Sequence, residues 1–275
     1  MLQSESKLLE VASTAAEEGG KVLLRLFRKD KLSVKRKFDY PGSVVTNADL
    51  KSERLILSRI KRSRIPSTVV SEEEGRVKFG GYSPIVWAVD PLDGTLNFSK
   101  HIPCFAVSIA VMIRDIPMIG VIYNPILDEL LTACRGQGAY LNGKRIHVSD
   151  TRSLHNSSLI FEWWNPEPRI PNPLAVERRL YSFTRSIRST GSVAMNLCSV
   201  ASGRFDGCVT VFRKSPLWEI PAGCLIAQEA GGRVTNSSGC PWESFAGSVV
   251  VAGEATHRRL MAVIQGNNYC SESLL

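Results

Sequence analysis

Hydrophobic residues recur every three or four positions along the first part of the chain, which is the spacing of one helix face. The residues on the first such face are Leu8, Ala12, Ala15, Gly19, Val22 and Leu26. The pattern predicts a long amphipathic helix over residues 4–28 and a second helix over residues 47–62, which Pro66 stops. The polar, basic segment 29–45 between them is expected to be a loop or a strand end.

After Pro66 the period changes to that of strands. Runs rich in β-branched residues predict strands at 68–71, 85–89, 105–113, 119–123, 130–134 and 139–141. Arg114–Pro117 and Gly136–Gly138 separate neighbouring runs and predict hairpin turns, and Asn142-Gly143 predicts a further tight turn. We therefore expect two helices followed by a mainly antiparallel sheet in the first half of the chain.

Strands and helices alternate in the second half, which predicts a layered α/β unit. The predicted strands are 158–162, a strand end near Ile187, 207–212 and 248–252, and the predicted helices are 174–184, 192–202, 220–230 and 255–265. Residues 163–173 are expected to be a proline-rich loop in which Trp163 and Trp164 pack against the protein or a second subunit, with stacking on a substrate as the alternative. We place one half at residues 1–150 and the other at 151–275, packed as one body.

Composition places the chain among folded globular proteins. It has 275 residues, of which 44% are hydrophobic and 22% are charged, and its net charge is +8. This charge favours an anionic partner, such as a phosphorylated metabolite, nucleic acid or a membrane surface. The longest uncharged stretch, 189–203, is shorter than the ~18–20 apolar residues of a membrane span. Without a visible signal peptide or a paired cysteine pattern, a cytoplasmic protein with reduced thiols is expected.

Two carboxylates stand close together after an apolar run that is expected to end at Asp90. Pro91 stops the strand, Asp93 follows three residues after Asp90, and Gly94 and Thr95 come next. Carboxylates at a strand end suit Mg²⁺, and the N–H groups of Gly94 and Thr95 suit a phosphate oxygen. The same letters also form an ordinary Asx-turn, which is the structural alternative.

Three further segments place acids where a site is expected. Glu72 and Glu73 follow a predicted strand, Asp49 lies in the first turn of the second helix, and Glu219 precedes the 220–230 helix. Each has a structural alternative. Glu72 and Glu73 could belong to a solvated run of charges, and Asp49 could form a capping box with Thr46. Glu219 could simply complement the helix dipole.

Taken in this order, the motifs resemble the inositol monophosphatase family of Mg²⁺-dependent, lithium-sensitive phosphatases. They are T-x-x-D, S-E-E, W-A-V-D-P-L-D-G-T-L-N-F, G-x-G-A-Y-L-N-G, R-S-T-G-S and W-E-x-x-A-G…E-A-G-G, and they span nearly the whole chain. The family includes fructose-1,6-bisphosphatases of archaeal type and 3′-phosphoadenosine-5′-phosphate phosphatases. The resemblance implies an α+β or α/β fold, a five-layer αβαβα sandwich of the sugar-phosphatase type, and a homodimer.

The resemblance also implies a metal centre of two or three Mg²⁺ ions, for which Mn²⁺ can substitute. Glu72, Asp90 and the carbonyl of Leu92 would hold the first ion. Asp90, Asp93 and Glu219 would hold the second, and a third ion would use Glu72. Nothing in the sequence offers a cysteine or histidine nucleophile, which agrees with attack by a metal-activated water.

By the same resemblance, Asp49 and Thr95 are catalytic residues that orient the attacking water, and Glu73 supports them. The residues implied in substrate binding are Gly94, Thr95, Gly191, Ser192, Arg213 and Lys214. Ser192 or Ser189 acting as a plain helix N-cap is the structural alternative for the R-S-T-G-S motif.

Two departures from the family pattern affect the site. Glu219 stands where the family has Asp, and its extra methylene either shifts the backbone or weakens the second metal. Thr210 or Phe212 stands where inositol-specific members carry an acid. Arg213 and Lys214 lie nearby and suit a second phosphate, although they could also be two solvated surface charges.

The function expected from the sequence is Mg²⁺-dependent hydrolysis of a small phosphorylated polyol or sugar, either inositol monophosphate, fructose 1,6-bisphosphate or both. A 3′(2′),5′-bisphosphate nucleotidase is one alternative. A non-catalytic member that binds phosphosugar or nucleic acid is another, but mutually repelling acids are costly to keep without cations. The expected partners are a small phosphorylated metabolite and a second copy of the chain, and neither a membrane nor nucleic acid.

Overall fold

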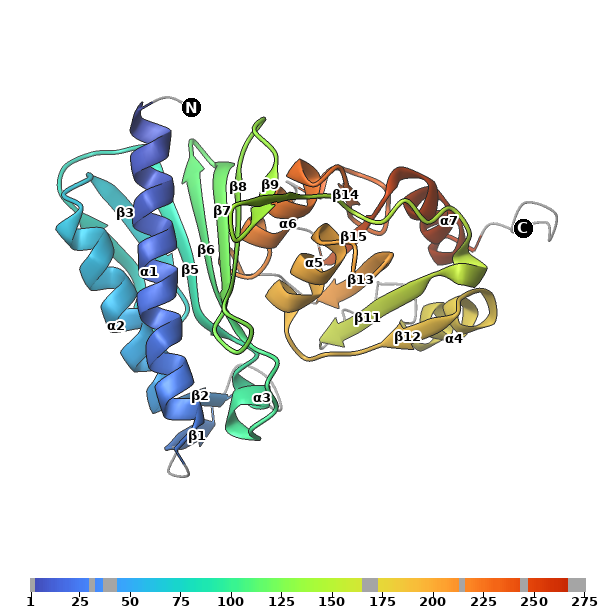
Figure 1. The fold of residues 1–275 in the computed structure, drawn as a ribbon, viewed down its shortest axis with the longest axis horizontal. Coiled ribbons are helices and arrows are strands. Elements are labelled where there is room, and N and C mark those ends of the chain that lie inside the picture. Colours follow the sequence, from blue (N-terminus) through green and yellow to red (C-terminus); the bar gives the residue numbers. More distant parts are fainter. Residues whose placement is uncertain are drawn as a thin grey trace.

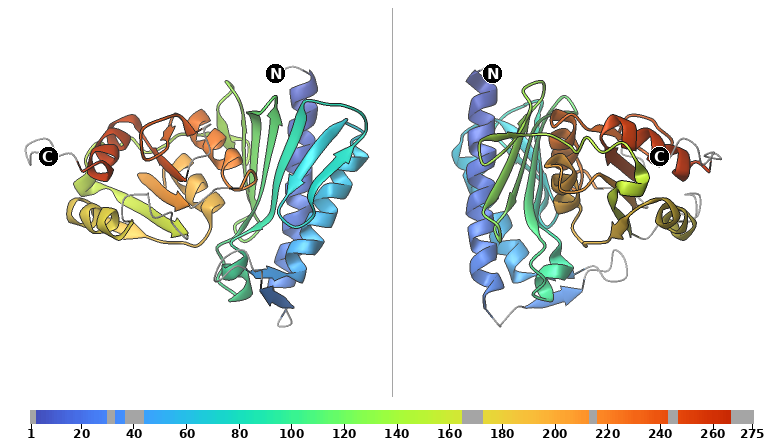
Figure 2. Two further views of the ribbon diagram at one scale, coloured as in Figure 1. Left: turned by 180° about the vertical axis from the view of Figure 1, so that it is seen from behind. Right: turned by 45° about the vertical axis from the view of Figure 1, so that its right-hand side comes forward.

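Helices and sheets alternate in five layers (Figures 1 and 2). The computed structural model describes residues 3–29, 33–36, 44–164, 173–212, 216–242 and 247–266. The helical layers are α1 (Gln3–Phe27) with α2 (Asn47–Arg62), α5 (Val193–Ala201) with α6 (Pro221–Glu229), and α4 (Pro173–Phe183) with α7 (Glu254–Ile264). An eight-stranded and a five-stranded sheet lie between them. The predicted αβαβα sandwich is confirmed.

The outer helices α1 and α2 cover one face of the first sheet, as their hydrophobic spacing predicts. Leu8, Ala12, Ala15 and Leu23 of α1 are buried. At Gly19 the two helices approach so closely that an added Cβ would lie 2.7 Å from Ser52 Oγ. Helix α2 matches its predicted bounds and ends before Pro66, whose ring cannot continue a helix.

The eight-stranded sheet is almost entirely antiparallel, as predicted. Its order is β10–β9–β8–β7–β6–β5–β3–β4, and the pair β3–β5 is parallel. The strands are β3 (Ser67–Ser71), β4 (Gly75–Phe79), β5 (Ile85–Asp93), β6 (Ala106–Ile113), β7 (Ile116–Asn124), β8 (Glu129–Cys134), β9 (Ala139–Leu141) and β10 (Lys144–Ile146). The sequence did not predict β4, an edge strand whose Arg76 and Lys78 side chains are exposed. The three predicted hairpin turns are confirmed.

Strand β5 continues past Pro91, so the prediction that it ends at Asp90 is wrong. Asp90 pairs with Ser108 and Asp93 pairs with Ala106, with a register shift between them. A bulge of this kind leaves residues unpaired, and a proline, which has no N–H to donate, is tolerated there. The bulge places both carboxylates on one irregular stretch of backbone.

The five-stranded sheet has the order β12–β11–β13–β15–β14. Its strands are β11 (Ser158–Trp164), β12 (Ser186–Arg188), β13 (Gly207–Phe212), β14 (Arg233–Thr235) and β15 (Ser248–Ala252). The prediction that Trp163 and Trp164 lie in a loop is wrong, because β11 extends to pair them with Val211 and Phe212. Aromatic residues favour strands, and pairing with β13 extends β11 through both tryptophans before the prolines begin.

Smaller elements complete the chain. They are β1 (Val34–Arg36), β2 (Val44–Thr46), the short helix α3 (Thr95–Ser99) and the 3-10 turn η1 (Leu154–Asn156). The first sheet ends at Ile146 and the second begins at Ser158, while the division at residue 150 stays a prediction. All six cysteines in the described ranges are free thiols, and four of them are buried.

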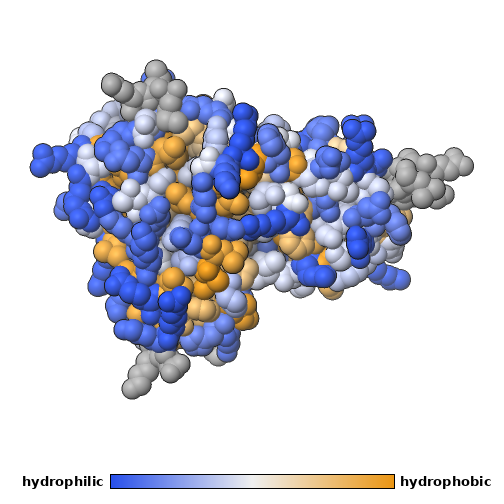
Figure 3. Space-filling model, in the orientation of Figure 1, coloured by the Kyte–Doolittle hydropathy of each residue, from blue (hydrophilic) through white to orange (hydrophobic). Residues whose placement is uncertain are grey.

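Hydrophobic residues gather in a band near the middle of the face shown in Figure 3, with hydrophilic residues around it. Large hydrophobic side chains that are exposed on the protein include Leu96, Ile102 and Leu127. Within the ranges that the structure describes, no helix combines the length and the apolar character needed to cross a membrane.

Candidate active site

The topology brings the predicted acidic residues to one end of the first sheet. Strands β3 and β5 are parallel neighbours, and Ser71 pairs with Val89. Glu72 directly follows β3 and Asp90 follows Val89 within β5, so the two residues lie at the same end of the sheet. The site is completed by Asp93 of the β5 bulge and by Glu219, which lies just before α6.

Asp90 is buried, and its Oδ1 accepts a hydrogen bond from the Leu92 amide at 3.0 Å. This is the local Asx-turn that the sequence also allowed. Burial raises the pKa of Asp90 well above its usual range, and the negative charges of Glu72, Asp93 and Glu219 raise it further. Glu72, Asp93 and Glu219 therefore lie close enough to Asp90 for their charges to act on it.

Asp93 is turned toward the N-terminus of α5. Its carboxylate accepts hydrogen bonds from Ser192 Oγ, from the Val193 amide at 3.2 Å and from the Ala194 amide at 3.1 Å. Burial raises the pKa of Asp93 to about 6, although these donors oppose the shift. Loss of solvent, with the charges of Asp93 and Glu72, raises the pKa of Glu219 to about 8.

The donor set fits Mg²⁺ in chemistry. It consists of carboxylate oxygens with the nearby Leu92 carbonyl, which are ligands that hard divalent cations prefer. A cation would also relieve the repulsion that raises these pKa values. Among the described residues, no group of three or more His, Cys, Asp or Glu side chains is arranged to hold a metal ion. The individual ligand roles of Glu72, Asp90, Leu92, Asp93 and Glu219 therefore stay predictions.

Asp49 serves two structures at once. Its Oδ2 accepts hydrogen bonds from the Thr46 amide at 2.8 Å and from Thr46 Oγ1 at 2.6 Å, which confirms the capping box. Its Oδ1 lies 3.0 Å from Thr95 Oγ1, which is also 2.9 Å from the Leu92 carbonyl. Burial raises the pKa of Asp49 to about 6. The structure thus brings together the two residues predicted to orient water.

Two glycines of the predicted substrate site occupy left-handed backbone conformations. Gly94 has a φ of 86°, and an added Cβ would lie 2.8 Å from the Cys104 carbonyl. Gly191 has a φ of 78°, and its Cβ would lie 3.0 Å from the Asn97 side-chain amide. Both positions favour glycine, because other residues rarely adopt this conformation.

Ser192 is the N-cap of α5, accepting a hydrogen bond from the Met195 amide at 3.3 Å. This confirms the structural alternative for the R-S-T-G-S motif. The Gly191 amide donates to Glu162 at 3.1 Å, so it points into the protein. The substrate-binding roles of Gly94, Thr95, Gly191 and Ser192 stay predictions. Arg213 and Lys214 lie outside the described residues.

The position at which inositol-specific relatives were expected to carry an acid lies on β13. Thr210 and Phe212 are both buried there. The Thr210 hydroxyl lies 3.3 Å from Cys208 Sγ on the same strand.

Two buried glutamates, Glu53 and Glu162, hold the loops that carry the site, and neither was predicted from the sequence. Glu53 of α2 accepts hydrogen bonds from the amides of Glu73 at 3.1 Å and Glu74 at 3.2 Å. Glu162 of β11 holds the segment before α5. The signal for Glu53 was its position four residues after Asp49, on the helix face that also buries Ile56 and Ile60.

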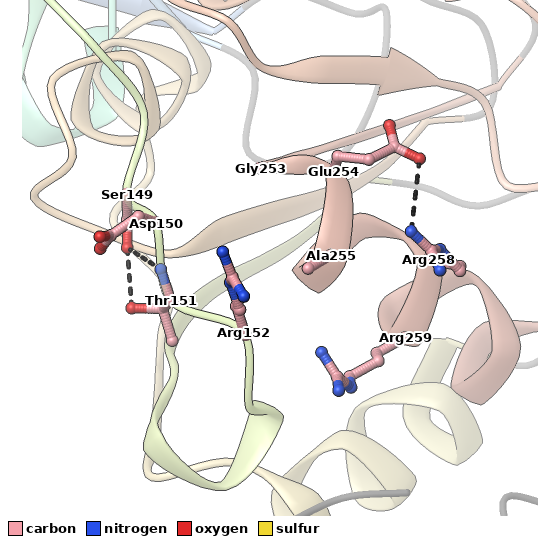
Figure 4. Close-up of a pocket in the computed structure, with 9 residues that line it drawn as sticks. All are labelled: Ser149, Asp150, Thr151, Arg152, Gly253, Glu254, Ala255, Arg258 and Arg259. Carbon is pink, nitrogen blue, oxygen red and sulfur yellow. Dashed lines mark hydrogen bonds and ion pairs between the residues drawn. The ribbon is translucent and has the colours of Figure 1, made fainter.

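A separate pocket of about 630 Å³ lies at the N-terminus of α7 (Figure 4). Arg152 and Arg259 point into it, while Arg258 lies 4.0 Å from Glu254 in an ion pair. No residue predicted to be catalytic, metal-binding or substrate-binding lines this pocket.

Known proteins resemble this chain over nearly its whole length. The sequence model of the inositol monophosphatase family matches residues 4–269. A Pasteurella multocida protein named Nus factor SuhB is 37% identical over 94% of this chain and 96% of its own. A Synechocystis protein named inositol-1-monophosphatase is 35% identical, over 92% of this chain and 86% of its own.

The fold agrees with this relationship. The crystal structure of extragenic suppressor protein suhB from Bartonella henselae superimposes with a TM-score of 0.86. It is 33% identical and covers 95% of this chain and 99% of its own. The chain belongs to the inositol monophosphatase family.

Proposed function

We propose that the protein is a Mg²⁺-dependent phosphomonoesterase that hydrolyses a small phosphorylated polyol or sugar. The observation that carries this proposal is the cluster of Glu72, Asp90, Asp93 and Glu219, in which burial and the charge of Glu72 raise the pKa values of the other three carboxyls. Such a cluster is unfavourable by itself and becomes favourable around a dication. Membership of the inositol monophosphatase family supports the same reaction class.

Glu72, Asp90, Asp93, Glu219 and the Leu92 carbonyl would hold the metal. Bound Mg²⁺ neutralises phosphate charge and lowers the pKa of a coordinated water. The protein's own contribution is to position the reactants, since phosphoryl transfer needs little covalent chemistry from the enzyme.

Asp49 and Thr95 would position the attacking water. The Thr95 hydroxyl lies 3.0 Å from Asp49 Oδ1 and 2.9 Å from the Leu92 carbonyl, and its oxygen would accept a hydrogen bond from the water. A buried carboxylate with a pKa of about 6 is also suited to accept a proton near neutral pH, because general bases work best when their pKa is close to the operating pH.

Inositol monophosphate and fructose 1,6-bisphosphate are the two proposed substrates. The name of the Synechocystis relative supports the first. The second is supported by Thr210 and Phe212, which give β13 no acid to contact sugar hydroxyls, and by Arg213-Lys214 in the sequence, which suit a second phosphate.

Phosphate release from a substrate panel tests the proposal. The panel compares inositol monophosphate, fructose 1,6-bisphosphate and adenosine 3′,5′-bisphosphate, each with Mg²⁺ and with EDTA. We expect Mg²⁺-dependent release from one or both of the first two. Release from the third alone would identify a nucleotidase. Absence of release from every substrate would favour a non-catalytic binding role, an alternative that the name Nus factor SuhB leaves open.

We also propose a lithium-sensitive cytoplasmic homodimer. The hydrophobic band in Figure 3 supports a homodimer, because exposed apolar patches commonly mark protein interfaces. Light scattering of the purified protein gives the oligomeric state, and inhibition of phosphate release by Li⁺ tests the lithium sensitivity.

A further inference from the structure

Glu162 is a buried carboxylate held by four donors. It lies near the C-terminal end of β11 and is 6% exposed. Its Oε1 accepts a hydrogen bond from Ser189 Oγ at 2.7 Å. Its Oε2 accepts from the amides of Thr190 at 3.0 Å and Gly191 at 3.1 Å, and from Asn196 Nδ2 at 3.1 Å. A carboxylate is costly to bury unless it is hydrogen-bonded, so this arrangement is a specific one.

The donors belong to one short turn, Ser189–Ser192, and to the helix that follows it. Figure 1 shows the connection from β12 to α5 passing the end of β11. Asn97 holds the turn from the other side, since its Nδ2 donates to the Thr190 carbonyl at 2.7 Å and to the Cys104 carbonyl at 2.9 Å. The turn is therefore fixed between β11 and the segment that follows β5.

The turn leads directly into the donors that hold Asp93. Ser192 Oγ and the amides of Val193 and Ala194 all donate to the Asp93 carboxylate. The direction of this carboxylate therefore depends on where the start of α5 lies. Glu162 is linked to these donors through the turn and through Asn196 of α5, and its two oxygens accept the four hydrogen bonds.

We propose that Glu162 is a positioning residue for the metal site: by fixing the Ser189–Ser192 turn, it sets the donors that orient Asp93. This inference rests on the proposed function, because it takes Asp93 as a metal ligand. Residues that orient metal ligands through hydrogen bonds typically change metal affinity by about 10- to 100-fold when they are replaced.

The test is the Mn²⁺ affinity of the full-length protein, measured by titration calorimetry. In Glu162→Gln one carboxylate oxygen becomes an NH₂ group. This group cannot accept the hydrogen bonds of the donors that face it, so the Ser189–Ser192 turn should no longer be fixed. Glu229→Gln is the matched control, because Glu229 also accepts two backbone amides, from Gly136 and Gly138 at 2.7 Å each, in the β8–β9 hairpin. Both variants should lose thermal stability. Only Glu162→Gln should lose Mn²⁺ affinity, by about 10-fold or more.

Two further variants separate positioning from a general loss of structure. Ser189→Ala removes one of the four hydrogen bonds to Glu162 and should weaken Mn²⁺ binding less than Glu162→Gln does. It replaces Glu162→Gln as the test variant if Glu162→Gln does not fold. Ser192→Ala removes a donor to Asp93. If Glu162 acts through this donor, the double variant Glu162→Gln/Ser192→Ala should lose less affinity than the two single losses combined.

The outcomes are distinguishable. Wild-type Mn²⁺ affinity in both Glu162→Gln and Ser189→Ala would overturn the inference, as would an equal loss in Glu229→Gln. If the wild-type protein binds Mn²⁺ but hydrolyses no substrate, the proposed function fails while the affinity comparison still decides the role of Glu162. If the wild-type protein binds no Mn²⁺, both are overturned.

Discussion

Gly94 gives a sharp test of how closely the site is packed. In Gly94→Ala the new Cβ would enter a backbone conformation with φ of 86° and lie 2.8 Å from the Cys104 carbonyl oxygen. The left-handed conformation costs an L-residue about 1–2 kcal/mol. Overpacking against backbone adds about 1–3 kcal/mol. The predicted loss in the free energy of unfolding is therefore about 2–5 kcal/mol.

Gly136→Ala is the matched control for this variant. Gly136 has a similar φ of 76°, but nothing lies within 4 Å of its Cβ position. It should lose only the conformational cost of about 1–2 kcal/mol. Because Gly94 joins Asp93 to Thr95, relief of the contact should also displace both residues, and a displacement of about 1 Å can lower the rate about 100-fold.

We test this prediction by measuring urea denaturation and Mg²⁺-dependent phosphate release on both variants. We expect Gly94→Ala to be the less stable variant and to lose most of its activity, while Gly136→Ala keeps wild-type activity. Equal stabilities together with full activity in Gly94→Ala would refute the reasoning.

Three other predictions follow from the structure. Asp90→Asn should abolish phosphate release. It should keep the fold, because it removes one buried negative charge from a group of carboxylates that repel one another. The release assay and circular dichroism check these two outcomes, and retained turnover would contradict the metal assignment. Glu219→Asp should bind Mg²⁺ equally or more tightly in calorimetry, whereas a large loss would mean that the backbone is built around the longer side chain. Burial and the charge of Arg233 lower the pKa of His257 from 6.5 to about 4, so between these values the unfolded chain binds a proton that the folded chain does not. The contribution of His257 to stability should be full above pH 6.5 and should fall by up to about 3 kcal/mol as the pH drops toward 4. The raised pKa values of Asp49, Asp93 and Glu219 act in the opposite direction, so the quantity to measure by urea denaturation is the difference in stability between the wild type and His257→Gln. This difference should shrink as the pH drops from 6.5 to 4, and a difference that does not change with pH would count against the assignment.

The hydrophobic periodicity of the sequence correctly predicted those helices and strands whose ends are set by local sequence signals. Helix α2 and strands β13 and β15 match their predicted bounds, because each has a clear hydrophobic spacing and a polar or proline boundary. The continuation of β5 past Pro91 could not be predicted in this way. It depends on pairing with β6 and on a register shift, which are properties of the sheet rather than of the segment.

At the candidate active site, too, the sequence could not predict contacts that depend on the folded structure. The sequence presented the capping box and the catalytic role of Asp49 as alternatives, yet one oxygen caps α2 and the other faces Thr95. Glu162 was missed because its donors lie 27 to 34 residues away along the chain. Their contact depends on the order of strands in the second sheet, and no local spacing encodes it.

An anomalous difference map from a crystal soaked in Mn²⁺ tests the central claim most directly. The account predicts a peak among the carboxylates of Glu72, Asp90 and Asp93, with oxygen ligands at bonding distance. A map in which these side chains point apart, with no ion between them, would contradict it.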